Sequence, residues 1–236
     1  MRAFLYGVSL QCRLDIRSRS LLVTCYIVPL LFFALMGSIF TSVMPEMRRT
    51  LIQSMIVMGV SMGAFIGLPP SLVEIYGSDV KKIYKANGVP LYLGLITMFL
   101  SAFLHLMIVC GIMVLVAPVA FDAVLPANMP LFFAALAIYI AVSLSIGSIL
   151  GLTMKSQARL TMISQLLFLP SIMLSGTMFP IQLLPKAMEI IGKIFPASWG
   201  YRLLLDHGFR MGNLWYPALL FLAAGTFCGV LLRVQK

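Results

Sequence analysis

Long apolar runs without charged residues alternate with short polar segments along this chain. A membrane-spanning helix needs about 20 predominantly apolar residues, and six of the runs approach or exceed that length. The pattern therefore predicts an all-α integral membrane protein, in which residues 1–236 form a single domain with six membrane-spanning helices. We place these spans at residues 21–44, 50–73, 91–117, 131–152, 160–178 and 211–232.

Two segments outside these runs carry helical patterns of their own. Residues 1–20 repeat basic and apolar positions at near-helical spacing. They predict an amphipathic helix that lies at the membrane interface, with an ordinary cytosolic lead-in as the alternative. In residues 179–210, Pro180, Pro185 and Pro196 separate pieces that are too short to span. Trp199 and other aromatic residues suit an interface, so we expect short re-entrant or interfacial helices at the outer leaflet.

The basic residues indicate how the chain is oriented. With six spans, both termini lie on one side, and that side carries eleven Lys and Arg residues against six on the other. Cytoplasmic segments carry the excess of Lys and Arg in membrane proteins. We therefore expect a multi-pass protein of the inner or plasma membrane with both termini in the cytoplasm.

Composition narrows the class of protein. Hydrophobic residues make up 61% and charged residues 10% of the chain, and its mean hydropathy is +1.04. An ordinary soluble domain is about 45–50% apolar and about 25% charged, so a soluble enzyme is excluded. The net charge is +10, but the charges lie at the ends of apolar runs. This placement favours lipid headgroups over nucleic acid as the partner.

The centres of the predicted spans contain no acidic residue, Lys or Arg. Ion-coupled transporters usually need such groups inside the membrane. Sodium can also bind to carbonyl oxygens, so an ion-coupled secondary transporter is kept as an alternative. His105 is the one histidine inside a span. It suggests either a proton relay or a neutral histidine bonded to a neighbouring helix, and we favour the second because no carboxylate partner is apparent.

Motifs for catalysis and metal binding are missing from the sequence. It holds no HExxH zinc motif and no GxSxG motif, and Gly192-Lys193 lacks the other residues of a phosphate-binding loop. We therefore expect no catalytic residue, no metal site and no cofactor in this chain. A chain of this kind needs another subunit to supply energy for uphill transport.

A polar stripe runs along the predicted fifth span. Counted from the first member, the others follow at offsets of 3, 4, 7, 10 and 14 residues, which places them on one helix face: Thr161, Ser164, Gln165, Phe168, Ser171 and Ser175. Gln53, Ser54 and Ser61 in the second span are possible counterparts. The stripe indicates either hydrogen bonding between helices or a pathway for an amphipathic substrate.

Small residues four positions apart recur in three spans: Gly59, Gly63 and Gly67; Ser143, Gly147 and Gly151; and Gly225 and Gly229. Such ridges let helix backbones approach closely. They favour packing within the bundle, with an interface between subunits as the alternative.

The most charged internal segment lies between the second and third spans, at residues 74–90. Gly77-Ser78 predicts the start of a short helix, and Asn87-Gly88 with Pro90 predicts its end. This helix would dock a cytosolic partner or, alternatively, lie in solvent without one. Its charged residues are Glu74, Asp79, Lys81, Lys82 and Lys85.

A series of short motifs resembles the permease subunits of type-2 ABC exporters. The motifs are Leu169-Pro170, Ser175-Gly176, Phe179-Pro180, Leu184-Pro185, Phe195-Pro196 and Trp199-Gly200-Tyr201-Arg202. The resemblance implies a homo- or heterodimer of permease subunits, with two copies of a cytosolic ATPase that bind ATP and Mg²⁺. It further implies that residues 74–85 couple to the ATPase and that spans two and five line the substrate pathway.

Substrates of the resembled family include drugs, peptides, lipids and glycolipids. A membrane assembly or immunity protein that transports nothing is kept as a further alternative.

Overall fold

The computed structural model describes residues 2–18, 22–77, 84, 86, 88, 90–179, 184–205 and 211–234. Within these residues the secondary structure is helical, without a strand. The α-helices are α1 (Arg2–Arg17), α3 (Val28–Val43), α4 (Leu51–Met62), α5 (Leu68–Tyr76), α7 (Leu91–Phe121), α8 (Met129–Thr153), α9 (Gln157–Met173), α10 (Lys186–Gly192), α11 (Pro196–Leu204) and α12 (Met211–Val234). Two π-helical turns, η1 (Val23–Ile27) and η3 (Gly63–Gly67), and one 3₁₀ turn, η2 (Pro45–Arg49), complete the series.

Five continuous helical segments are long and apolar enough to cross a membrane. They are Val23–Val43, Leu51–Tyr76, Leu91–Phe121, Met129–Thr153 and Leu214–Arg233. Each lies within a few residues of a predicted span, so five of the predicted runs do form apolar helices of spanning length.

The predicted fifth span differs from its observed counterpart. Helix α9 has 17 residues and ends at Met173 rather than near residue 178. Pro170 lies inside its last turn, and Gly176 adopts a φ of 86° in the turn that follows. A left-handed residue of this kind ends helices. Because about 17 residues is the lower limit for a span, the count of six spans stays a prediction.

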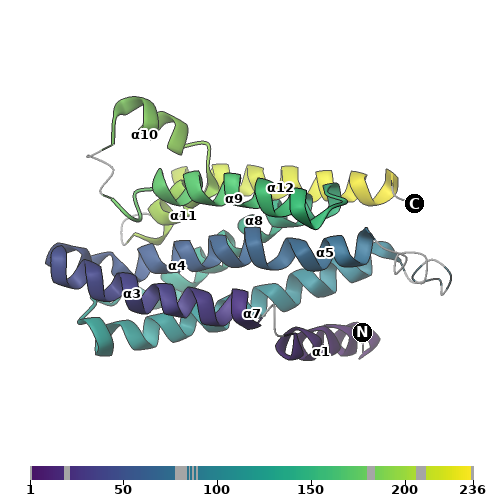
Figure 1. Cartoon of the computed structure of the whole chain (residues 1–236), viewed down its shortest axis with the longest axis horizontal. Helices are drawn as coiled ribbons and strands as arrows, with labels where there is room; N and C mark the ends of the chain where they lie inside the picture. The colour runs from purple at the N-terminus through teal and green to yellow at the C-terminus, as the bar shows by residue number, and fades with distance from the viewer. Residues whose placement is uncertain are drawn as a thin grey trace.

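The long helices run side by side along one axis (Figure 1). Both chain termini, the end of α5, the start of α7 and the turn between α8 and α9 lie at one end of the molecule, which we call the terminal end. The loops that join α3 to α4 and α7 to α8 lie at the opposite end, together with α10 and α11. The arrangement agrees with termini on one side of a membrane.

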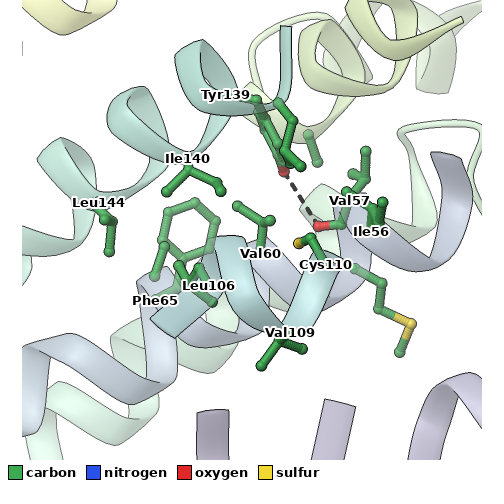
Figure 2. Packing of buried hydrophobic residues seen from close by; sticks show 14 of the residues in the cluster. Ile56, Val57, Val60, Phe65, Leu106, Val109, Cys110, Tyr139, Ile140 and Leu144 are labelled. Atoms are coloured by element: carbon green, nitrogen blue, oxygen red, sulfur yellow. Dashed lines mark hydrogen bonds between the residues drawn. The ribbon is translucent and has the colours of Figure 1, made fainter. Parts of the chain in front are cut away.

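The segment formed by α4, η3 and α5 is the centre of the bundle. In its most apolar stretch 89% of the residues are buried, against 17% for α12. Its core residues meet apolar side chains from α7 and α8, as Figure 2 shows for Ile56, Val60, Leu106, Cys110 and Ile140.

Each π-helical turn ends two residues before a proline. Pro29 follows η1 at the second position of α3, and Pro69 follows η3 at the second position of α5. Proline has no N–H and its ring clashes with the carbonyl four residues earlier, so a helix that continues through it must widen or bend. The two wide turns also pack on each other, since a Cβ on Gly67 would lie 2.9 Å from Cys25 Sγ.

Glycines let α8 approach the central segment. A Cβ on Gly147 would collide with the Ala64 carbonyl oxygen, and one on Gly151 would lie 2.6 Å from Leu72 Cβ. By contrast, a Cβ on Gly225 or Gly229 in α12 would meet no atom within 4 Å. The ridges of spans two and four therefore serve packing within the chain, and that of span six does not.

Helices α10 and α11 form a compact unit that is tied to α12. The Trp199 indole N–H donates to the Lys193 carbonyl at 2.7 Å, and the Tyr216 hydroxyl donates to the Ile194 carbonyl at 2.9 Å. The rings of Trp199 and Tyr216 stack with their centroids 4.5 Å apart. Two short helices thus lie between α9 and α12 as predicted, and their position relative to the outer leaflet stays a prediction.

We expect Gly147→Ala to destabilise the protein by about 1–3 kcal/mol, the usual cost of overpacking, because the new methyl group meets a backbone carbonyl. The measurement is thermal or denaturant unfolding of the purified protein. The matched control is Gly111→Ala in α7, where a Cβ meets no atom within 4 Å and alanine is the better helix former by about 0.5–1 kcal/mol. Equal stability of the two variants would contradict the prediction.

Candidate functional site

The second-span candidates lie inside the chain. Gln53, Ser54 and Ser61 are exposed by 2%, 0% and 0%. The Ser61 hydroxyl is hydrogen-bonded to the Tyr139 hydroxyl at 2.7 Å. Gln53 Oε1 and Ser54 Oγ are buried without a hydrogen-bond partner. The central helix therefore holds one hydroxyl, on Ser61, that is hydrogen-bonded to α8. It also holds two side-chain oxygens, on Gln53 and Ser54, that have no hydrogen-bond partner.

The stripe on α9 divides into a buried and an exposed part. Ser164, Phe168 and Ser171 are buried, where α9 packs on α4, η3 and α5. Thr161 and Gln165 are exposed on the surface of the single chain, and the Thr161 hydroxyl donates to the Gln157 carbonyl at 2.9 Å. Helical periodicity placed these five and Ser175 on one face, but Ser175 is buried in the turn after α9 and the contact with α4 covers only part of that face.

Four buried polar residues on α4 and α9 share an unusual property, since each has a side-chain oxygen without a hydrogen-bond partner. They are Gln53, Ser54, Ser164 and Ser171, which we call the orphan polar set. An unpaired polar group costs free energy when it is buried away from water, and buried polar groups in native proteins are nearly always paired. The orphan polar set therefore calls for an explanation outside the single chain.

Tyr139 was missed by the sequence reasoning. It lies in the middle of α8, is 3% exposed, and its hydroxyl also donates to the Val57 carbonyl at 3.3 Å (Figure 2). Its ring packs on Gly200 of α11. A tyrosine in the middle of an apolar span is the signal that could have found it, because a buried hydroxyl needs a partner.

The charged segment at residues 74–90 begins at the terminal end of the bundle. Glu74 is exposed near the end of α5. Two residues later, the Tyr76 hydroxyl donates to the Leu91 carbonyl at 2.6 Å, which ties the end of α5 to the start of α7. Asp79, Lys81, Lys82 and Lys85 lie outside the described residues.

A carboxylate that the sequence pattern did not associate with His105 lies near it. Helix α1 packs on α7 and brings Asp15 close enough to interact electrostatically with the His105 ring. Asp15 accepts a hydrogen bond from Ser101 at 2.5 Å, one helical turn before His105. The hydrogen bond that the favoured alternative expects is present, since His105 Nδ1 is hydrogen-bonded to the Tyr26 hydroxyl of η1 at 2.6 Å.

Among the residues that the structure describes, no group of three or more His, Cys, Asp or Glu is placed to hold a metal ion. The buried polar side chains described in the apolar bundle are hydroxyls, the Gln53 amide and the His105 imidazole.

Comparison with known families adds a finding that the geometry alone does not supply. Residues 41–233 match the family described as ABC-2 family transporter protein. No curated protein sequence matches the chain. The family match covers the central segment, α7 to α9 and the α10–α11 unit, and the apolar helices make the chain a multi-pass membrane protein. The chain therefore belongs to the ABC-2 family of transporters, as a membrane transport component rather than a catalyst itself.

Proposed function

We propose that this chain is the permease subunit of an ATP-driven exporter, which forms the substrate path and takes its energy from a separate ATPase. The observation that carries the proposal is the family match over residues 41–233, because ABC-2 permeases generally work with a cytosolic ATPase subunit. The sequence also lacks a phosphate-binding loop of its own. The proposed substrate is an amphipathic molecule such as a drug, peptide, lipid or glycolipid.

The proposed assembly contains two permease copies and two ATPase copies, with ATP and Mg²⁺ bound by the ATPases. Two outer helices have faces that the single chain does not cover. In the most apolar stretch of α12 only 17% of the residues are buried, and in that of the span containing α3 only 28% are buried. Lipid and a second copy would cover these faces. We place the terminal end in the cytoplasm of a plasma or inner membrane, because most Lys and Arg residues belong to that side.

We further propose that Glu74, Asp79, Lys81, Lys82 and Lys85 couple the permease to the ATPase. The support is their position in the chain, since the end of α5 and the start of α7 lie at the terminal end (Figure 1). The hydrogen bond from Tyr76 to Leu91 holds those two helix ends together. Force applied to the segment would therefore reach the central helix directly.

For the substrate path we propose the predicted residues on α4 and α9. The orphan polar set supports this proposal, because a water-filled or substrate-filled path would satisfy hydroxyls and an amide that the single chain leaves unpaired. In this view the described structure is the closed state, and movement of α9 away from α4 opens the path. Thr161 and Gln165 already face outward. Phe168 and the Ser61–Tyr139 pair would form apolar and polar parts of its wall.

The function is tested by purifying the tagged chain from its native membranes in a mild detergent. We expect an ATPase with a GxxxxGK[ST] loop to co-purify in equal amount, and the reconstituted complex to move substrate only when ATP is hydrolysed. Transport by the permease alone on an ion gradient would instead establish the ion-coupled alternative. Purification without any ATPase would favour the assembly or immunity protein.

The coupling role predicts the effect of a charge reversal. We expect the triple variant Lys81→Glu, Lys82→Glu, Lys85→Glu to lower ATP-driven transport at least about tenfold, because each reversed charge becomes repulsive toward an acidic docking surface. The variant should still insert in the membrane. Transport by the reconstituted permease–ATPase complex is the measurement.

The matched control for the charge reversal is Lys186→Glu, an exposed basic residue of α10 at the other end of the molecule. It makes one charge reversal of the same kind and should leave transport unaltered. Transport at the wild-type rate in the triple variant would remove the docking role.

The path proposal predicts thiol accessibility. In a chain without its four native cysteines, Ser164→Cys and Ser171→Cys should react with a membrane-impermeant cationic methanethiosulfonate in at least one nucleotide state. Both serines are at most 2% exposed in the described state, so reaction requires opening.

The matched control for accessibility is a chain that keeps Cys110 as its single cysteine. Cys110 is 1% exposed and lies among apolar side chains where α7 meets α4 (Figure 2). It should stay unreactive in every nucleotide state. If Ser164→Cys and Ser171→Cys are protected as completely as Cys110, the residues serve packing and the path lies elsewhere.

A further inference from the structure

A cavity of about 360 Å³ lies between α1, η1, α5 and α7. This volume falls at the lower end of the range for small-molecule sites, about 300–1,000 Å³. Most of its wall is apolar, with Leu22, Leu68, Met98 and Ala102 among the lining residues. The π-helical turn η1 borders it through Cys25 and Tyr26, and Leu68 at the start of α5 lies directly after η3 in the sequence.

One wall of this cavity carries a carboxylate. Asp15 is held in place by two neutral donors, since its Oδ1 accepts from the Gln11 amide at 2.8 Å and its Oδ2 accepts from the Ser101 hydroxyl at 2.5 Å. Among the described residues, no Lys or Arg lies within ion-pair distance of Asp15. A carboxylate beside an apolar cavity is stabilised most by a cation. The cavity therefore has a carboxylate on its wall without a described basic partner.

His105 provides a second and independent indication of a ligand. It lines the same cavity and is 7% exposed, yet its Nε2 has no hydrogen-bond partner. The other ring nitrogen is already bonded to Tyr26. The Cys12 carbonyl of α1 lies close enough to the ring to act on it as a hydrogen-bond acceptor, but no contact of Nε2 has the geometry of a full hydrogen bond. Nε2 can donate or accept according to the tautomer, so a polar atom of a bound molecule would satisfy it.

We propose that this cavity binds an amphipathic amine, with the ammonium group against Asp15 and the apolar body among Leu68, Met98 and Ala102. The charge of Asp15 selects for a cation and disfavours a phosphate or carboxylate group, which it would repel. The polar atom that His105 Nε2 contacts lies on the same polar part of the ligand. The apolar wall then buries the remaining surface.

This site is separate from the path proposed above. Asp15, Cys25 and Tyr26 precede the matched range at residue 41, and no member of the orphan polar set lines the cavity. Binding to the cavity needs neither the ATPase nor transport. The site can therefore exist whether or not the chain exports amines.

The test measures binding of dansylcadaverine to the full chain in nanodiscs of neutral lipid near pH 7. This probe joins a primary amine to an apolar dye whose emission strengthens and shifts to shorter wavelength in apolar surroundings. An alkyl amine is protonated at this pH. The saturable part of the signal is compared with that of the N-acetylated probe, which has the same dye and chain but no charge.

We expect saturable binding of the amine and at least tenfold weaker binding of the acetylated probe. Asp15→Asn should weaken amine binding at least about tenfold, the usual consequence of losing a charge-assisted hydrogen bond. Ala102→Leu, which fills the cavity with a larger side chain, should remove the saturable signal. Asp122→Asn, the same change at the opposite end of the bundle, should bind as the wild type does.

Equal affinity for the two probes, or unchanged binding in Asp15→Asn, would overturn the proposal. So would saturable binding that survives Ala102→Leu, because the ligand would then lie elsewhere. If Asp15→Asn fails to fold, the comparison of the two probes and the Ala102→Leu variant still test whether the cavity binds the amine.

Discussion

The close approach of α8 to the central segment, where Gly147 meets the Ala64 carbonyl, is the contact on which the rest of the structure depends. Lipid tails are as apolar as leucine side chains, so helices in a membrane gain little from hydrophobic burial and associate through close packing instead. The central segment is buried on all sides because small residues admit its neighbours this closely. The outer helices, the α10–α11 unit and the interior polar groups are then arranged around it.

The sequence predicts the spans well where composition changes sharply. Charge-free runs bounded by Arg48 or Lys155 translate into helices with nearly the expected ends. The predicted end is wrong for α9, because Pro170 and the left-handed Gly176 stop the helix before the end of a run that contains no charged residue. Hydropathy reflects how well a segment dissolves in lipid and does not depend on backbone conformation. A helix end that is set by backbone conformation therefore cannot be predicted from it.

The candidate site is predictable only in part for a related reason. Periodicity correctly groups Ser164 with Ser171, but it cannot say that a neighbouring helix covers them and leaves Gln165 outside. Nor can it bring Asp15 to Ser101, a contact between residues 86 positions apart. The wide turns η1 and η3 add to the difficulty, because each shifts the helix phase, so that faces before and after the turn no longer align.

The aromatic cluster that joins α11 to α12 has a consequence for spectroscopy. The chain contains two tryptophans, and Trp199 and Trp215 lie in edge-to-face contact with centroids 6.2 Å apart. All intrinsic tryptophan emission therefore originates from one small region at the end far from the termini. Quenching or spectral shifts of this emission would report motion of the α10–α11 unit against α12. They would not respond to changes near α1.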